Sequence, residues 1–382
     1  MQLDLAPSAA PEQRRDSIDP AATLGLLMAA ALAITPEYAS AATPPDGTLV
    51  GIKYLDYLDY SQEGDRMRVS APLLYLSAPL SDAMAMEASA TVDSMSGASP
   101  EFHNTLSGAS KRGIHDRRTA ADAKLRRYFE RSNFAVGIAH SDENDYRSNA
   151  ANLEGQWLSA NQNTTLTVGL GYSDDHISSE NQPKLHETRH TRSVLAGLTQ
   201  VLSPDDILQS NLSYSDGDGY FSDPYKALDK RPASRHQLAW LTRYNHYFTP
   251  LDAALHLDYR YYRDSWNVRS HTLQASWHQD IGSWSVIPSL RYYSQSAASF
   301  YSDRFPPAKF GTLYSADHRL GAFGALTLGV KLAKIIATDL VIDIQAEFYQ
   351  QRSSWKLGGE GSPSLQPMSA RIIMIGLNKT FR

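Results

Sequence analysis

The residues best suited to chemistry in this chain are histidines that lie close in sequence to carboxylates or to other histidines. Such groups could provide general acid–base catalysis in a hydrolase. No nucleophile motif accompanies them, and sequence spacing alone does not bring any pair together. We therefore expect solvated histidines and no catalytic residues, with a hydrolase at the rim of the molecule as an alternative. The candidate groups are His140 with Asp142, His176 with Asp174 and Asp175, and His186 with His190.

An aromatic-Ser-Asp phrase occurs four times and could form a carboxylate-rich, calcium-binding rim. Asp216-Gly217-Asp218-Gly219 resembles the start of a calcium loop, but Ala227 stands at the twelfth position, where a Glu is needed. We favour another interpretation, in which each aromatic residue lies at a membrane interface and turn-forming residues follow it. No metal site is therefore expected. The four phrases are Tyr172-Ser173-Asp174, Tyr214-Ser215-Asp216, Phe221-Ser222-Asp223 and Tyr301-Ser302-Asp303.

Cysteine is absent from the 382 residues. This excludes disulfides, thiolate metal sites and covalently attached c-type haem. The sequence also contains no flavin or haem motif. We expect no cofactor.

The stretch from Arg192 to Phe248 shows which elements must position these residues. Apolar side chains that recur with a period of two over about ten residues indicate a strand with one apolar and one polar face. Turns that are alternately short and long are typical of an up-and-down barrel that crosses a membrane. The mean hydropathy of −0.40 argues against membrane helices but allows strands that are polar at every second position. The alternation is clearest in Leu208, Gln209, Ser210, Asn211, Leu212, Ser213 and Tyr214.

The same pattern continues from Thr48 to Phe381 and predicts an all-β fold, a transmembrane antiparallel up-and-down barrel of about sixteen strands. Closure is required because an open sheet would leave unpaired backbone groups in hydrocarbon. An even number of strands places both termini on one side, the periplasm. A soluble β-sandwich or propeller is the alternative and would have shorter strands. The expected long loops are Ser94–Arg118, Ser173–Thr188, Ser215–Ser234, Ser294–His318 and Ser353–Met368.

Residues 1–41 have the features of an export signal, which leaves residues 42–382 as the barrel domain. Arg14 and Arg15 precede an apolar core, Ala21–Ile34, and Ala39-Ser40-Ala41 supplies small residues for cleavage before Ala42. The core is too short to span a bilayer comfortably. The mature chain would be almost neutral, so nothing in its charge favours nucleic acid as a partner.

Charged residues on the polar faces of the expected strands are the candidates for a functional lumen. Because both signs occur, they could line a water-filled pore or neutralise one another in ion pairs. Arg243, Arg260 and Arg291 fall on nearly adjacent strands and predict a positive wall that attracts anions. The alternative is neutralisation of that wall across the lumen by the acidic members of the set. The candidates are Arg243, Asp258, Arg260, Arg291, Lys331, Asp343 and Glu347.

Several phrases give the chain a resemblance to a known family. Over Val50 to Phe381 it resembles bacterial outer-membrane β-barrels described only as a domain of unknown function. The resemblance implies fold and location, and it suggests periplasmic redox proteins as partners. The phrases are Arg127–Arg131 (RYFER), Thr199–Pro204 (TQVLSP), Ser222–Lys226 (SDPYK), Tyr261–Trp266 (YYRDSW) and Pro288–Ala298 (PSLRYYSQSAA).

The end of the chain, Gly376–Phe381, resembles the closing strand that barrel-insertion machinery recognises, although Arg382 follows the aromatic residue. We therefore expect a bacterial outer-membrane barrel in contact with outer-membrane lipid and the insertion machinery. It would act as a pore or as the membrane component of an envelope export or redox assembly. A rim hydrolase and a purely structural scaffold are the alternatives.

Overall fold

The computed structural model describes residues 43–61, 64–97, 114–180, 182–226, 228–304 and 311–382. The expected export signal, residues 1–41, lies outside them. Within the described residues no helix is long and apolar enough to span a membrane. In the described residues the helical segments are three single 3-10 turns: η1 (Thr249–Leu251), η2 (His318–Leu320) and η3 (Ser353–Trp355).

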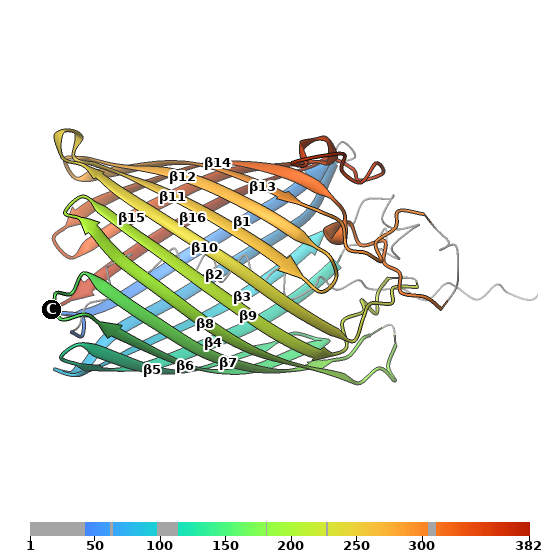
Figure 1. The fold of residues 1–382 in the computed structure, drawn as a ribbon, viewed down its shortest axis with the longest axis horizontal. Helices are drawn as coiled ribbons and strands as arrows, with labels where there is room; N and C mark the ends of the chain where they lie inside the picture. The colour runs from blue at the N-terminus through green and yellow to red at the C-terminus, as the bar shows by residue number, and fades with distance from the viewer. Residues whose placement is uncertain (1–42, 62–63, 98–113, 181, 227, 305–310) are drawn as a thin grey trace, which may run out of the picture.

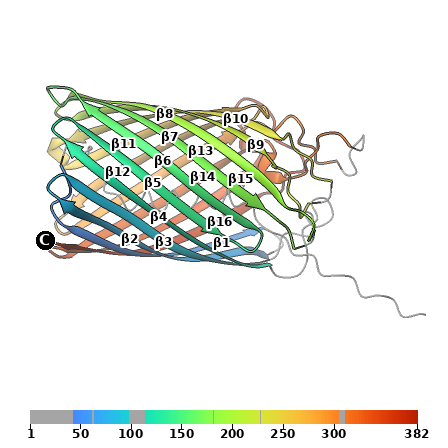
Figure 2. The same cartoon turned by 90° about the horizontal axis from the view of Figure 1, so that it is seen from below.

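Sixteen strands form one closed antiparallel barrel in which each strand pairs with its neighbours in sequence and β1 pairs with β16 (Figures 1 and 2). This confirms the predicted fold class and strand number. Closure gives every strand two hydrogen-bonded partners, as hydrocarbon requires. The strands are β1 (Thr48–Ser61), β2 (Gly64–Ser81), β3 (Met84–Gly97), β4 (Ile114–Phe129), β5 (Ser132–Asp142), β6 (Tyr146–Leu158), β7 (Thr164–Ile177), β8 (Glu187–Ser203), β9 (Asp206–Gly219), β10 (Ser234–Phe248), β11 (Ala253–Asp264), β12 (Arg269–Ile281), β13 (Trp284–Gln295), β14 (Phe323–Ala337), β15 (Leu340–Arg352) and β16 (Met368–Phe381).

The outer face of the barrel is apolar because alternate side chains of each strand point away from the lumen. On β14, Leu328 is 59% exposed and the next outward residue, Val330, is 40% exposed. Large apolar groups with such exposure are suited to contact with lipid. Tyr172 and Tyr214 lie on this face towards the loop end of β7 and β9, and Trp284 lies at the opposite end. These aromatic residues mark the two interfaces of the apolar band.

The two ends of the barrel differ (Figure 1). Short turns and the C-terminus occupy one end, and the longer connections occupy the other. By the usual topology of such barrels, the end with short turns is periplasmic and the end with longer connections is external. Among the external connections that the structure describes throughout, two are also short, residues 143–145 between β5 and β6 and residues 265–268 between β11 and β12.

The external hairpins extend further than the sequence predicted. β3 continues to Gly97 and β4 begins at Ile114, so the expected loop Ser94–Arg118 is too long at both ends. β9 continues to Gly219, so Asp216–Gly219 belongs to a strand and the resemblance to a calcium loop is wrong. The predicted strand ends were wrong because each strand was expected to stop at the surface of the bilayer. Paired strands keep their backbone hydrogen bonds in water as well, so the hairpins continue beyond it.

An apolar patch lies on the inner face where β16, β1 and β2 adjoin. Leu55, Ala71 and Met374 are cross-strand neighbours and are each at least 95% buried, with Tyr57 and Ile372 packed against them. The inner faces of the remaining strands are more polar. The interior of the barrel is therefore chemically asymmetric around its circumference.

Candidate functional site

The candidate site consists of the inner wall formed by β10–β15 and the folded loops at the external mouth. Strand register places all seven candidate charges on the inner face, opposite the exposed apolar side chains. Arg243 and Asp258 are direct cross-strand partners, as are Leu241 and Arg260 on the same pair of strands. The structure thus gathers the candidates on one side of the barrel.

Arg243 and Asp258 form a loose ion pair. Arg243 Nε lies 3.6 Å from Asp258 Oδ2, and the two side chains are 35% and 30% exposed. A pair with this much exposure is screened by water and is worth roughly 0–1 kcal/mol. Asp258 therefore neutralises part of the predicted positive wall.

Arg260 and Arg291 are exposed on the inner face, and neither forms an ion pair with a described carboxylate. The Arg260 guanidinium lies 5.4 Å from the centre of the Tyr262 ring. Arg291 Nε donates a 2.8 Å hydrogen bond to Gln274 Oε1 on β12. Because both partners are uncharged, these interactions orient the guanidiniums and leave their positive charge uncompensated.

The remaining acidic candidates interact with their own neighbours on β14–β16. Lys331 Nζ lies 3.8 Å from Asp343 Oδ1, and Asn378 donates a 3.2 Å hydrogen bond to the second oxygen of Asp343. Glu347 accepts a 2.6 Å hydrogen bond from Gln345. Asp343 and Glu347 thus do not pair with Arg260 or Arg291.

The opposite wall carries charges that balance one another. Arg126 Nη2 on β4 lies 2.8 Å from Glu154 Oε1 on β6, across the intervening β5. At the external end of the same wall, Arg118 Nη2 lies 2.7 Å from Asp93 Oδ2, and both side chains are almost completely buried. The uncompensated positive charge therefore lies on the β11–β13 side.

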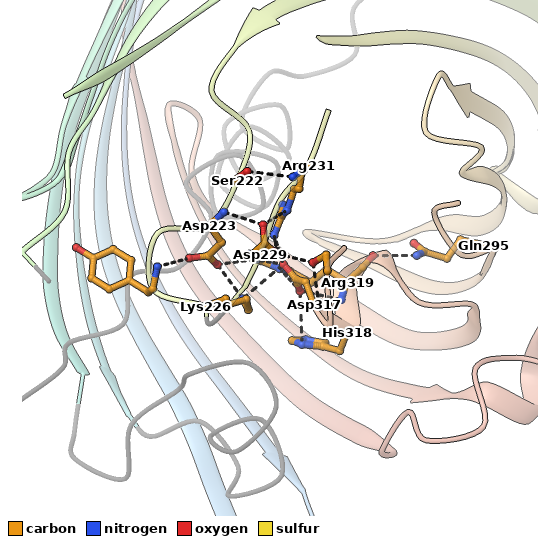
Figure 3. Close-up of polar contacts among 11 residues, drawn as sticks. Ser222, Asp223, Lys226, Asp229, Arg231, Gln295, Asp317, His318 and Arg319 are labelled. Atoms are coloured by element: carbon orange, nitrogen blue, oxygen red, sulfur yellow. Dashed lines mark hydrogen bonds and ion pairs between the residues drawn. The ribbon is translucent and has the colours of Figure 1, made fainter. Parts of the chain in front are cut away.

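Two loops, residues 220–233 and 296–322, meet at the external mouth (Figure 3). Lys230 and Tyr314 form an isolated antiparallel bridge with backbone hydrogen bonds of 2.7 and 2.9 Å. Gln295, at the end of β13, donates hydrogen bonds of 2.9 and 2.6 Å to the backbone oxygens of Arg319 and Gly321. The two loops are thus joined to each other and to the barrel wall. We call their described residues the cap.

Asp317 lies at the centre of the cap and is almost completely buried. Its carboxylate accepts hydrogen bonds from Arg231 Nη2 at 2.9 Å and Arg319 Nε at 2.9 Å, and Lys226 Nζ lies 3.5 Å away. Two further carboxylates complete the network. Asp229 bonds to Arg231 at 2.9 Å and accepts a 2.5 Å hydrogen bond from Ser315, and Asp223 pairs with Lys226 at 2.8 Å.

The network shifts the pKa values of its two buried carboxyl groups in opposite directions. Burial alone would raise the pKa of Asp317, but the adjacent Arg319, Lys226 and Arg231 hold it well below its ordinary value. For Asp229, burial outweighs the attraction of Arg231 and raises the pKa of its carboxyl. Asp317 is therefore the stable anionic centre of the cap.

An apolar cluster supports the cap from the ends of the strands. Trp266 is 2% exposed and packs edge-on against Phe300 and Phe221, with ring centres 5.2 and 5.5 Å apart. The Arg235 guanidinium lies 4.1 Å from the Trp266 ring and 2.7 Å from Asp264. This packing ties both cap loops to the β10–β12 end of the barrel.

Residues 178–186, between β7 and β8, also contact the cap. The backbone N–H of Glu180 donates to the Tyr225 hydroxyl at 3.1 Å, and Gln182 Nε2 donates to the oxygen of Pro224 at 3.0 Å. The cap is therefore also attached to a third external connection, the one between β7 and β8.

Sequence reasoning did not identify the cap network. Two of its members lie in the Ser222–Lys226 phrase, and Asp317-His318-Arg319 is a compact run of charge, but Asp229 and Asp317 belong to loops separated by four strands. No spacing rule relates them. The aromatic-Ser-Asp phrases divide in two: Tyr172 and Tyr214 lie on strands at the membrane interface, as favoured, whereas Phe221 and Tyr301 lie in the cap.

The rim histidines form different contacts from those of the candidate catalytic groups. His140 Nδ1 lies 2.8 Å from Asn149 Oδ1, and Asp142 pairs instead with Arg147 at 2.7 Å. His190 lies 3.0 Å from Asp174. In the described residues no serine or threonine hydroxyl is hydrogen-bonded to these histidines, and no group of three His, Cys, Asp or Glu could hold a metal ion.

Comparison with known proteins agrees with this architecture. A family model described as "Protein of unknown function (DUF3570)" matches residues 24–372. No curated protein matches the sequence. A solved "Bacterial polysaccharide outer membrane secretin" is 10% identical, with a TM-score of 0.51, and the match covers 88% of this chain and 99% of that one. "CdiB from Acinetobacter baumannii" is also 10% identical with a TM-score of 0.51, covering 86% of this chain and 60% of that one. At such identity the likeness concerns the fold of an outer-membrane barrel.

Proposed function

The chain belongs to the family described as Protein of unknown function (DUF3570) and is an outer-membrane β-barrel, and we propose that it forms a water-filled channel that prefers small anions. The observation that carries this proposal is the pair of arginines, Arg260 and Arg291, exposed on the inner face without a carboxylate partner among the described residues. A sixteen-stranded barrel is wide enough for an aqueous path. Fixed positive charge in a confined channel raises the local concentration of anions.

The uneven distribution of charge around the lumen places the anion path on one side of the barrel. The β3–β6 wall is balanced by Arg126–Glu154 and the β14–β15 wall by Lys331–Asp343. The field in the lumen is then dominated by the β11–β13 arginines. An anion entering beside the cap would pass along this side of the barrel.

Reversal potentials in planar bilayers test the proposal. In a potassium chloride gradient, the wild-type protein should favour chloride, and Arg260→Glu with Arg291→Glu should shift the potential towards potassium. The matched control is Arg147→Glu with Arg192→Glu, which makes the same charge change on the outer face and should leave the potential where it was. An unchanged potential in the lumen variant would assign these arginines a structural role.

Conductance itself separates the channel from its alternative. A membrane component of an export or redox assembly would give no regular single-channel steps as a purified protein, and its activity would depend on added periplasmic partners. A rim hydrolase would cleave lipid or ester substrates without conducting. Regular steps with anion preference support the channel.

A further inference from the structure

Two arginines face each other on the outer surface of the barrel near its external end. Arg263 on β11 and Arg269 on β12 are direct cross-strand partners, and both side chains are exposed. Register places them on the same face as Leu273, which is 54% exposed. They therefore point away from the lumen, and the channel proposed above does not use them.

Opposed like charges destabilise a sheet unless something lies between them. Among the described residues neither arginine forms an ion pair, and the other cross-strand neighbour of Arg263 is Leu238. The backbone N–H of Arg269 donates to the Ser296 hydroxyl at 2.9 Å, which fixes the strand and leaves the guanidinium uncompensated. The two positive charges thus have no negatively charged partner among the described residues.

Two other outward cations at this end of the barrel have carboxylate partners. Arg147 lies 2.7 Å from Asp142, and His236 lies 2.7 Å from Asp216. Arg192 and Arg371 are exposed on the same face and form no ion pair among the described residues, but neither has another cation as a direct cross-strand neighbour. The direct opposition of two cations is therefore what sets Arg263 and Arg269 apart.

A histidine adds a third donor to the same place. His271 follows Arg269 on the outer face of β12, and its Nδ1 lies 2.8 Å from the Tyr259 hydroxyl. If the tyrosine donates this hydrogen bond, the proton of a neutral imidazole is on Nε2, which is then an N–H donor beside the two guanidiniums. The Tyr261 ring packs against His271, with ring centres 5.2 Å apart.

The height of this cluster matches the headgroup region of the external leaflet. Tyr259 and Tyr261 lie at the end of the apolar band, where interfacial aromatics are expected. Arg263 is two residues further along the strand, about 7 Å beyond Tyr261. Side chains at this height meet the charged groups of lipids rather than their acyl chains.

We propose that Arg263, Arg269 and His271 bind a phosphate group of the phosphorylated glycolipid in the external leaflet. Arginine guanidiniums present paired N–H donors that match phosphate oxygens, and two of them on adjacent strands can hold one phosphate between them. The phosphate relieves the repulsion between the two arginines. Lipid binding therefore stabilises the β11–β12 hairpin, and the bare protein carries the unrelieved repulsion.

Binding to detergent-solubilised lipid A tests this assignment, with enzymatically dephosphorylated lipid A and inorganic phosphate as comparison ligands. Wild type should bind lipid A more tightly than the dephosphorylated form. Arg263→Gln with Arg269→Gln should weaken lipid A binding about thirtyfold and abolish the preference. The control Arg147→Gln removes another exposed outward arginine, one that has a carboxylate partner, and it should bind like wild type.

Thermal unfolding gives a second readout whose sign distinguishes the proposal from a purely structural role. Without lipid, the double glutamine variant should unfold at a higher temperature than wild type, because the repulsion is gone. Added lipid A should raise the unfolding temperature of wild type more than that of the variant. Equal binding by wild type and double variant, or a variant less stable without lipid, would overturn the proposal. Equal stabilisation by inorganic phosphate would also overturn it, since the site would then hold a free anion.

Discussion

The inner wall and the cap use similar charged residues in opposite ways. On the wall, Arg260 and Arg291 are exposed and have uncharged partners, and the Arg243–Asp258 pair is loose at 3.6 Å. In the cap, Asp317 is 1% exposed and contacts three cations. Buried charges must be paired, and their pairing fixes the position of the loops that carry them. Exposed charges without ionic partners contribute little to folding and are available to passing solutes.

The strongest test of this contrast removes one charge from the cap. Asp317→Asn leaves Arg231, Arg319 and Lys226 without their shared anion, and loss of one member of a buried ion pair costs about 3–5 kcal/mol. We expect the cap to detach, single-channel conductance to rise, and protease to cleave the 296–322 loop. Asp303→Asn, the same change in the same loop at a residue without a described ion pair, should have neither effect. An intact cap in Asp317→Asn would show that the apolar cluster around Trp266 is sufficient.

A second test concerns the two faces of the wall. Leu257 lies on the lipid side of β11, so Leu257→Arg should destabilise the folded barrel by roughly 2–4 kcal/mol. Asn211→Arg, on the inner face of β9, should be tolerated. Urea-induced unfolding in lipid vesicles measures both. An equal loss of stability in the two variants would contradict the assignment of inner and outer faces on which the comparison depends.

A third test uses pH. The pKa of Asp317 is held well below its ordinary value, so its stabilising contribution is fully present above about pH 4 and is lost as pH falls through the lowered pKa. Conductance of the capped channel should therefore stay constant from pH 7 to about pH 4 and rise only in stronger acid. A transition between pH 5 and pH 7 would implicate another group of the cap, such as Asp229, whose pKa is raised by burial.

The smallest effect is expected from removing the negative charge beside Arg243. Asp258→Asn should move the reversal potential modestly further towards chloride. Asp216→Asn, which removes a carboxylate from the outer face, should not change it. An unchanged reversal potential in Asp258→Asn would mean that this aspartate does not influence the anion path.

The barrel was predictable from sequence because each strand carries its own evidence. Alternation in 208–214 identifies a two-faced strand without reference to the rest of the chain. The same parity identified the facing of Arg243 and Asp258, which the structure places as direct cross-strand partners. Strand ends were less predictable, as β9 shows by continuing to Gly219, because the membrane does not determine where a hairpin stops pairing.

The cap could not be derived in this way. Arg231 and Asp317 are 86 residues apart, and their pairing depends on how two loops fold over the mouth. Nothing periodic links loop residues. Sequence reasoning therefore placed the exposed charges of the wall and missed the buried network.

The seam between β1 and β16 has a consequence for the assembly of the protein. Thr48 pairs with Phe381 and Tyr60 with Ser369. The first strand of the barrel therefore cannot complete its pairing until the last strand has been synthesised. Until then, two strand edges carry unsatisfied hydrogen-bonding groups and can pair with other chains. Such long-range pairing also slows folding. Loss of the final strand would therefore leave a chain that aggregates rather than a smaller barrel.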